Sequence, residues 1–219
     1  MNSVSYDPGA QKGQDVKRFD QSIDFVGNDR GAWISKIVGA KQRLGVRPQR
    51  GYWFRRLCYT QTVEELDFNR HESVRDYFPL SEAWQVPPPA SWELECALSE
   101  KKTERESEGV VLAHISTSRP CKEWSLEAWL RFAELAEGSG ESVIFSSGPA
   151  DREQALLKEL ERKLPGMQRL PHDLSVKDFM ARLARARLVV SMDTATLHLA
   201  AGLGKPTVGL FGPTDAARW

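Results

Sequence analysis

From Gly109 onward, short apolar runs alternate with helical patterns, and this alternation constrains the fold more than any other feature. The apolar runs predict strands over 109–116, 143–145, 188–190 and 206–211. Between them the spacing predicts helices from Ser125 to Gly138, over 151–164, from Ser175 with Asp178 as a capping partner, and over 193–203. Such alternation needs crossover connections onto a parallel sheet, which predicts a doubly wound α/β domain.

The first half of the chain is less regular. A strand is predicted over 22–26 and a helix over 30–44, with an apolar face formed by Trp33, Ile34, Ile37 and Val38. One strand and one helix do not close an α/β domain, so this half is predicted to be incomplete. The expected organisation is a polar tail at 1–17, a partial domain at 18–99, a charged linker at 100–108 and the α/β domain at 109–219.

Composition narrows the class of protein. The 30 Lys and Arg residues balance 30 Asp and Glu residues in 219, which is typical of a globular protein and disfavours nucleic acid as a partner. No apolar run reaches the roughly 18 residues of a membrane helix, and the first residues do not resemble a signal peptide. Three widely spaced cysteines (Cys58, Cys96 and Cys121) fit free thiols in a reducing compartment. We therefore expect a cytoplasmic protein.

The most informative stretch runs from Ser191 to Asp215. It places Asp193 and Thr194 between a strand and a helix, at the carboxyl edge of the predicted sheet, where open α/β sheets bind ligands. The backbone N–H groups of Ala195, Thr196 and Leu197 are expected to be unpaired there. Together with the helix dipole they would form an anion site suited to a diphosphate. The alternative is that Asp193 and Thr194 are only helix caps.

Two other strand ends carry small polar residues. Ser116–Ser118 follows the first strand, with Lys122 close behind, and Ser146–Gly148 follows the second, with Glu153 one turn into the next helix. Hydroxyls and a lysine can hold phosphate oxygens, whereas the alternative is a solvated loop with a surface lysine. Because three strand ends meet at one edge of the sheet, the sequence favours a ligand site there.

Several common chemistries lack their motifs. The sequence has no glycine-rich dinucleotide or P-loop motif, no nucleophile elbow, no His-Glu-x-x-His and no Asp-x-Asp. The histidines are too far apart to predict a ligand cluster; they are His71, His114, His172 and His198. Neither a protein-bound metal nor another cofactor is therefore expected.

The stretch from Asp193 to Ala201, followed by 204–215, resembles the signature of the heptosyltransferase-type glycosyltransferases of family 9. His114–Ser118 with Lys122, Trp124 and Trp129 is similar to the family's phosphate-loop region, and 23–45 resembles the middle of its amino-terminal domain. The resemblance implies a GT-B-like fold with a nearly complete Rossmann-like donor domain at 109–219 and an incomplete acceptor domain at 18–99. It also implies ADP-heptose as donor and a lipopolysaccharide-core acceptor.

The resemblance assigns roles to individual residues. Lys122 and Asp193 would be catalytic, with His198 behind Asp193 rather than in proton transfer. The implied donor-binding residues are Ser116, Thr117, Ser118, Lys122, Glu153, Met192, Asp193, Thr194, Ala195 and His198. The family usually has glycine where this chain has Ala195. Fixed N–H groups and a lysine would stabilise the departing diphosphate without a metal.

The resemblance also has a gap. The family's general base is an aspartate after the first strand, and nothing before Arg18 resembles that segment; the last helix of the donor domain also has no counterpart. Three functions therefore remain open: a metal-independent transferase of a heptose-like sugar, a non-catalytic sugar-nucleotide-binding module, and another GT-B enzyme such as a sugar-nucleotide epimerase.

One further pattern stands apart from the motifs. Between Arg30 and Val63 there are eight Lys or Arg residues and no acidic residue, interleaved with Trp33, Tyr52, Trp53 and Phe54. This favours an electropositive face for an anionic glycolipid or glycan acceptor and peripheral contact with the inner membrane. The alternative is an ordinary solvated helix face and loop.

Overall fold

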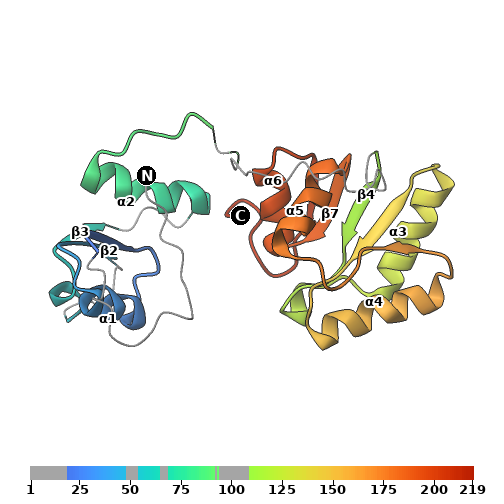
Figure 1. Cartoon of the computed structure of the whole chain (residues 1–219), viewed down its shortest axis with the longest axis horizontal. Helices are drawn as coiled ribbons and strands as arrows, with labels where there is room; N and C mark the ends of the chain where they lie inside the picture. The colour runs from blue at the N-terminus through green and yellow to red at the C-terminus, as the bar shows by residue number, and fades with distance from the viewer. Residues whose placement is uncertain (1–18, 48–53, 65–68, 92, 94–108) are drawn as a thin grey trace. The chain divides into compact units, whose positions relative to one another are not determined.

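The computed structural model describes residues 19–47, 54–64, 69–91, 93 and 109–219, and it divides into two compact units (Figure 1). The first unit holds the described residues up to Pro88 together with Ala217–Trp219, and the second runs from Pro89 to Ala216. The predicted tail at 1–17 and the predicted linker at 100–108 lie outside the described residues.

The first unit is built on a three-stranded parallel sheet in the order β1-β2-β3. Its elements are β1 (Gln21–Asp24), α1 (Asp29–Val38), β2 (Gln42–Arg47), the 3-10 turn η1 (Arg55–Leu57), β3 (Gln61–Glu64) and α2 (Glu72–Trp84). The predicted first strand is confirmed, whereas β3 and α2 were not predicted. The last residues of the chain join this unit, because Glu72 N donates to Arg218 O at 2.9 Å.

The helix predicted over 30–44 ends earlier than expected, and its apolar face is not the face that is buried. Gly39 adopts a left-handed conformation (φ 68°) and its N–H bonds to Lys36 O, so α1 ends at Val38 and the chain enters β2. Three residues of the apolar face, Trp33, Ile34 and Ile37, are exposed, and Val38 is half-buried. The helix is instead buried through Ala32 and Ser35, whose small side chains allow close packing.

The second unit has a five-stranded parallel sheet in the order β6-β5-β4-β7-β8, which confirms the predicted doubly wound domain. The strands are β4 (Val111–His114), β5 (Val143–Ser146), β6 (Gln168–Arg169), β7 (Leu188–Met192) and β8 (Thr207–Leu210). The helices are η3 (Pro120–Lys122), α3 (Leu126–Gly138), α4 (Asp151–Lys163), α5 (Val176–Arg185) and α6 (Ala195–Gly202). Only β6, a two-residue edge strand, has no predicted counterpart among these strands.

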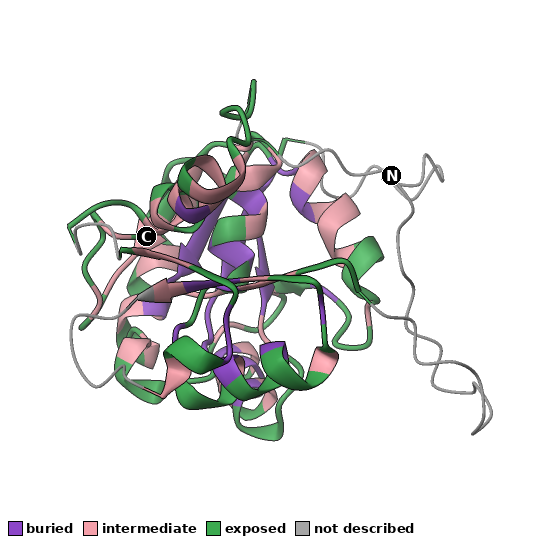
Figure 2. Cartoon of the chain, turned by 90° about the vertical axis from the view of Figure 1, so that its left-hand side faces the viewer, coloured by how far each residue is buried: buried purple, intermediate pink, exposed green. Residues whose placement is uncertain are grey.

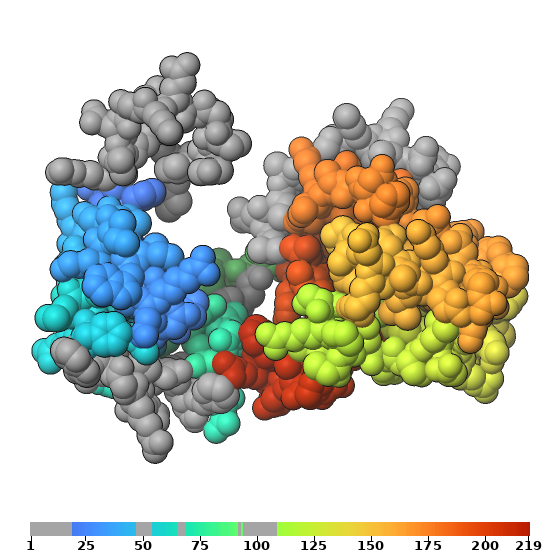
Figure 3. Space-filling model, turned by 90° about the horizontal axis from the view of Figure 1, so that it is seen from below, coloured from blue at the N-terminus to red at the C-terminus, as the bar shows by residue number. Residues whose placement is uncertain are grey.

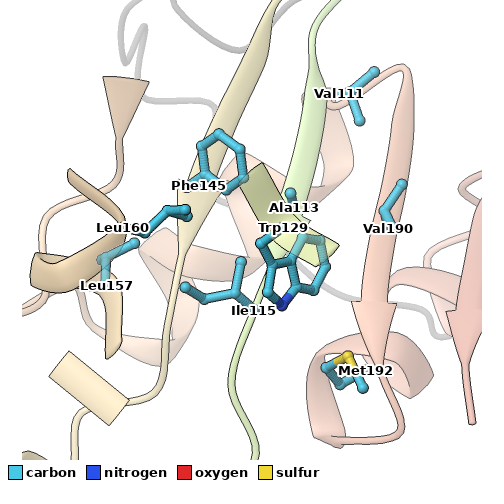
Figure 4. Packing of buried hydrophobic residues seen from close by; sticks show 9 residues of the cluster. All are labelled: Val111, Ala113, Ile115, Trp129, Phe145, Leu157, Leu160, Val190 and Met192. Carbon is cyan, nitrogen blue, oxygen red and sulfur yellow. The ribbon is translucent and has the colours of Figure 1, made fainter. Parts of the chain in front are cut away.

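Two hydrophobic clusters cover the two faces of this sheet. One joins alternate residues of β4 to Trp129 of α3 and Leu160 of α4 (Figure 4), and the other contains Leu183 of α5 and Ala200 of α6. Helices therefore pack on both faces, and burial is concentrated in the strands (Figure 2). Within the described part of the chain, no helix is both long enough and apolar enough to cross a bilayer.

Candidate functional site

The candidate site lies at the carboxyl edge of the second unit's sheet, where the loops after β4, β5, β7 and β8 meet. Parallel pairing of β7 with β8 brings Asp193 beside the end of β8, and Asp193 N donates to Leu210 O at 3.1 Å. The segment after β8 also lies against the loop after β4 (Figure 3), since a Cβ on Gly212 would be 3.3 Å from Cys121 O.

Lys122 and Asp193, far apart in the sequence, form an ion pair at the centre of the site. Lys122 Nζ lies 2.5 Å from Asp193 Oδ2, and the Asp193 side chain is only 4% exposed. The hydroxyl of Thr214 donates to the same Oδ2 at 2.5 Å. His198 Nε2 lies 3.8 Å from Asp193 Oδ1, with its own side chain 43% exposed. The structure thus brings both predicted catalytic residues together and adds Thr214.

These neighbours determine the charge state of Asp193. Burial on its own would raise the pKa of this carboxyl group, but hydrogen bonds from Lys122 and Thr214, and the charges of Lys122 and His198, outweigh that effect. The pKa of Asp193 therefore lies below its ordinary value. The carboxylate is ionised at neutral pH and fixes the ammonium group of Lys122 beside it.

The start of α6 differs in two respects from the sequence-based expectation. Leu197 N donates to Thr194 O at 3.0 Å, so the prediction that this N–H is unpaired is wrong. Thr194 is the N-cap residue by backbone conformation, but its hydroxyl makes no capping bond. The first-turn N–H groups of Ala195, which is exposed, and Thr196, which is buried, remain as the donors that a helix start offers.

Ser116, Glu153 and Gly148 form a second, more deeply buried cluster. The Ser116 hydroxyl donates to Glu153 Oε1 at 2.9 Å and accepts from Gly148 N at 2.8 Å. Ser116 is 0% exposed and Glu153 is 7% exposed. A Cβ on Gly148 would lie 2.6 Å from Glu153 Cδ, so only glycine leaves room for this carboxylate. The cluster joins the ends of β4 and β5 to the first turn of α4.

The loop after β4 is held by its own hydrogen bonds. Thr117 is 2% exposed, and its hydroxyl donates to Arg119 O at 2.7 Å and accepts from Arg119 N at 2.9 Å. Glu123 Oε1 accepts from Thr117 N at 2.8 Å, and Arg152 NH1 pairs with Glu123 Oε2 at 2.7 Å. Ser118 is exposed beside them. Sequence reasoning missed Glu123, Arg152 and Thr214, because no motif marks an interaction between residues so far apart.

One predicted donor-binding residue belongs to the core. Met192 is 1% exposed and packs in the cluster that contains Ile115 and Trp129 (Figure 4). Within the described residues, no group of three or more His, Cys, Asp or Glu side chains could hold a metal ion.

Fewer cations of the first unit are available for an electropositive face than the sequence indicates. Arg43 donates to Cys58 O at 2.8 Å, Arg55 pairs with Asp29 at 2.5 Å, and Lys36 donates to Leu57 O at 3.1 Å. These three cations therefore support the unit's own loops. Arg50, Tyr52 and Trp53 lie outside the described residues.

Comparison with known proteins agrees with this architecture. The family model for glycosyltransferase family 9 (heptosyltransferase) matches residues 13–219. The chain is 30% identical over 217 residues to lipopolysaccharide heptosyltransferase 1 of Pseudomonas aeruginosa, covering 90% of this chain and 55% of that protein. It is 34% identical over 100 residues to lipopolysaccharide heptosyltransferase 1 of Salmonella typhimurium, covering 46% of this chain and 31% of that protein. The chain therefore spans only part of these relatives.

A solved structure of the Escherichia coli heptosyltransferase WaaC with ADP matches the fold with a TM-score of 0.75 at 23% identity. That match covers 92% of this chain and 63% of the solved one. Both the family model and the fold extend across the two α/β units described above. The chain therefore belongs to glycosyltransferase family 9, the heptosyltransferase family.

Proposed function

We propose that this chain takes part in transferring a heptose-like sugar from ADP-heptose to a lipopolysaccharide-core or related glycan acceptor, without a metal ion. The observation that carries the proposal is the Lys122–Asp193–Thr214 cluster beside the start of α6. Relatives named as lipopolysaccharide heptosyltransferases and a fold neighbour solved with ADP support it.

The opposite charges of Lys122 and Asp193 imply different roles toward an anionic donor. The Asp193 carboxylate repels a diphosphate, so the group that meets the donor is the Lys122 ammonium, while Asp193 holds that ammonium in place. The first-turn N–H groups of α6 add partial positive charge nearby. As the sugar–phosphate bond breaks, negative charge grows on the departing diphosphate, and donors already fixed in place stabilise it.

The remaining predicted residues surround this centre in the proposal. The loop from Ser116 to Ser118 would offer backbone and hydroxyl donors to the phosphates. Glu153, held by Ser116, would accept hydrogen bonds from nucleoside or sugar hydroxyls. Thr194, Ala195 and the backbone of Met192 would line the approach to α6, and exposed His198 would lie beside the sugar.

A binding experiment tests the donor site. In Lys122→Ala the cation is lost and the Asp193 carboxylate faces the diphosphate, so ADP should bind about 10- to 100-fold more weakly in calorimetric titration. Asp193→Asn should weaken ADP binding less, because the lysine remains. Lys158→Ala, on the exposed side of α4, is the matched control and should leave the dissociation constant unchanged. Equal affinities of Lys122→Ala and the unmodified chain would contradict the proposal.

A transfer assay distinguishes the enzyme from its alternatives. Release of ADP with formation of a glycosylated acceptor, unaffected by a chelator, supports a metal-independent transferase. Binding of ADP without turnover supports a sugar-nucleotide-binding module, and a rearranged free sugar supports an epimerase.

The first unit is proposed to receive the anionic acceptor at the cytoplasmic face of the inner membrane. Arg30, Trp33, Ile34 and Ile37 recur at helical spacing on α1, and all four are exposed. Such a stripe suits a surface that is both apolar and negatively charged. Sedimentation with phosphatidylglycerol vesicles should fall when Trp33 and Ile37 are changed to Ser, whereas equal sedimentation with neutral vesicles would contradict a charged surface.

A further inference from the structure

A single arginine of α4 ties down the loop that carries Lys122. Arg152 forms a two-pronged pair with Glu123, with NH1 2.7 Å from Oε2 and NH2 3.0 Å from Oε1. The same NH2 group donates to Thr117 O, while Glu123 Oε1 accepts from Thr117 N at 2.8 Å. The Arg152–Glu123 pair therefore binds both main-chain groups of Thr117: the arginine binds the carbonyl oxygen and the glutamate binds the N–H.

The other end of the loop has little freedom either. Lys122 N bonds to Arg119 O at 3.0 Å, and a Cβ on Gly212 would be 3.5 Å from Lys122 Cα. The segment of Gly212 also carries Thr214, which bonds to Asp193. The Lys122 backbone is thus held from two directions. On one side the next residue, Glu123, bonds to Arg152 of α4, and on the other lies the segment after β8. The Lys122 ammonium group bonds to Asp193.

We propose that Arg152 and Glu123 are positioning residues that set the Lys122 ammonium against Asp193, ready for the donor diphosphate; this inference rests on the proposed function. Glu123 directly follows Lys122, so fixing its carboxylate fixes the turn from which the lysine side chain leaves. A guanidinium group binds both oxygens of the Glu123 carboxylate and so fixes its orientation, whereas a lysine at position 152 would supply the charge without this two-point contact.

The contacts of the pair, more than its exposure, argue for positioning. The Arg152 side chain is 43% exposed, which limits what its charge contributes to folding free energy, whereas the Glu123 side chain is 10% exposed and bonds to the backbone of the loop at Thr117 N. A control pair lies on the same helix. Arg162 and Glu159 are 2.7 Å apart, and the arginine side chain is 68% exposed. The hydrogen bonds of this pair join the two side chains to each other and not to the loop that carries Lys122.

The test needs a readout that does not involve nucleotide. Because Lys122 lowers the pKa of Asp193, release of the lysine should raise that pKa, as measured by carboxyl-carbon NMR on the full chain without ligand. Arg152→Gln and Arg152→Lys should both raise it, and Arg162→Gln should not. An unchanged pKa of Asp193 in both Arg152 variants overturns the inference, even if they bind nucleotide weakly.

Binding of ADP and of inorganic pyrophosphate gives the second readout. Both Arg152 variants, and Glu123→Gln, should weaken both ligands about tenfold, while Arg162→Gln leaves both unchanged. Weakening of ADP alone would mean that the pair acts on the nucleoside, which overturns the role assigned to Lys122. If the unmodified chain binds neither ligand, the proposed function fails, while the pKa of Asp193 still decides whether the pair positions the lysine.

Discussion

His114 makes the stability of the second unit depend on pH. It ends the central strand β4, is 5% exposed, and places Nδ1 2.9 Å from Ser146 Oγ, with the ring of Phe179 nearby. Burial disfavours the charged imidazolium and lowers the pKa of His114 from 6.5 to about 4. The native unit therefore keeps this histidine neutral at pH values where the unfolded chain protonates it.

The sign and the size of the effect follow from this difference. Below pH 6.5 the unfolded chain binds the proton and the native unit does not, so stability falls as the pH drops and the loss is complete below about pH 4. The full difference corresponds to about 3 kcal/mol, of which about 2 kcal/mol is lost between neutral pH and about pH 5. That loss is roughly a 30-fold change in the opening equilibrium.

Hydrogen exchange of the β4 amides measures the opening of this unit. Comparing the unmodified chain with His114→Asn at each pH cancels the intrinsic exchange rate, and the asparagine amide can still bond to Ser146. The protection of the unmodified chain should fall about 30-fold more than that of the variant between neutral pH and about pH 5. His172→Asn, at an exposed position, serves as the control. Parallel pH profiles for His114→Asn and the unmodified chain would refute the reasoning.

Two further substitutions probe the packing of polar groups. Gly148→Ala should displace the Glu153 carboxylate and weaken ADP binding about tenfold in calorimetry. Gly138→Ala is the control, because the space around Gly138 is open, and it should leave ADP binding unchanged. If Gly148→Ala and the unmodified chain bind ADP equally, Glu153 is not part of the site. Tyr59→Phe removes a hydrogen bond to the buried carboxylate of Asp24 and should cost about 1–3 kcal/mol in urea unfolding; an unchanged midpoint would show that water replaces the hydroxyl.

The second unit could be predicted from sequence because its local signals agree with its tertiary structure. The helices predicted to begin at Ser125 and Ser175 are capped by the hydroxyls of these serines, which accept from Ala128 N at 3.2 Å and Asp178 N at 3.1 Å. Apolar strands buried on both faces give continuous hydrophobic runs, which are easy to recognise. The two-residue edge strand β6 gives no such signal and was missed.

The first unit was harder for physical reasons. The helix pattern through Trp33 and Ile37 continues past Gly39, yet the left-handed conformation of that glycine ends α1. The larger apolar residues of the helix face solvent, which hydrophobic spacing cannot indicate. The helix α2 contains a proline, Pro79, and lacks a clear apolar period, so neither usual signal marked it.

The candidate site was predicted in its residues but not in its contacts. Lys122 and Asp193 were both named from the sequence, each with a role toward the donor. Their ion pair depends on the parallel pairing of β4 with β7 and on the loop geometry after β4. No local pattern encodes that pairing, and it changes the interpretation of Asp193 from a donor contact to a support for the lysine.

The strand order of the second unit also determines how its chain must be assembled. β4 lies in the middle of the sheet but comes first along the sequence, and Val111 pairs with both Val143 and Leu188. One edge of β4 therefore stays open during synthesis until residues near Leu188 have left the ribosome. Until then this apolar strand is a template for wrong pairing, so nascent chains stalled before β7 should be the species most dependent on chaperones.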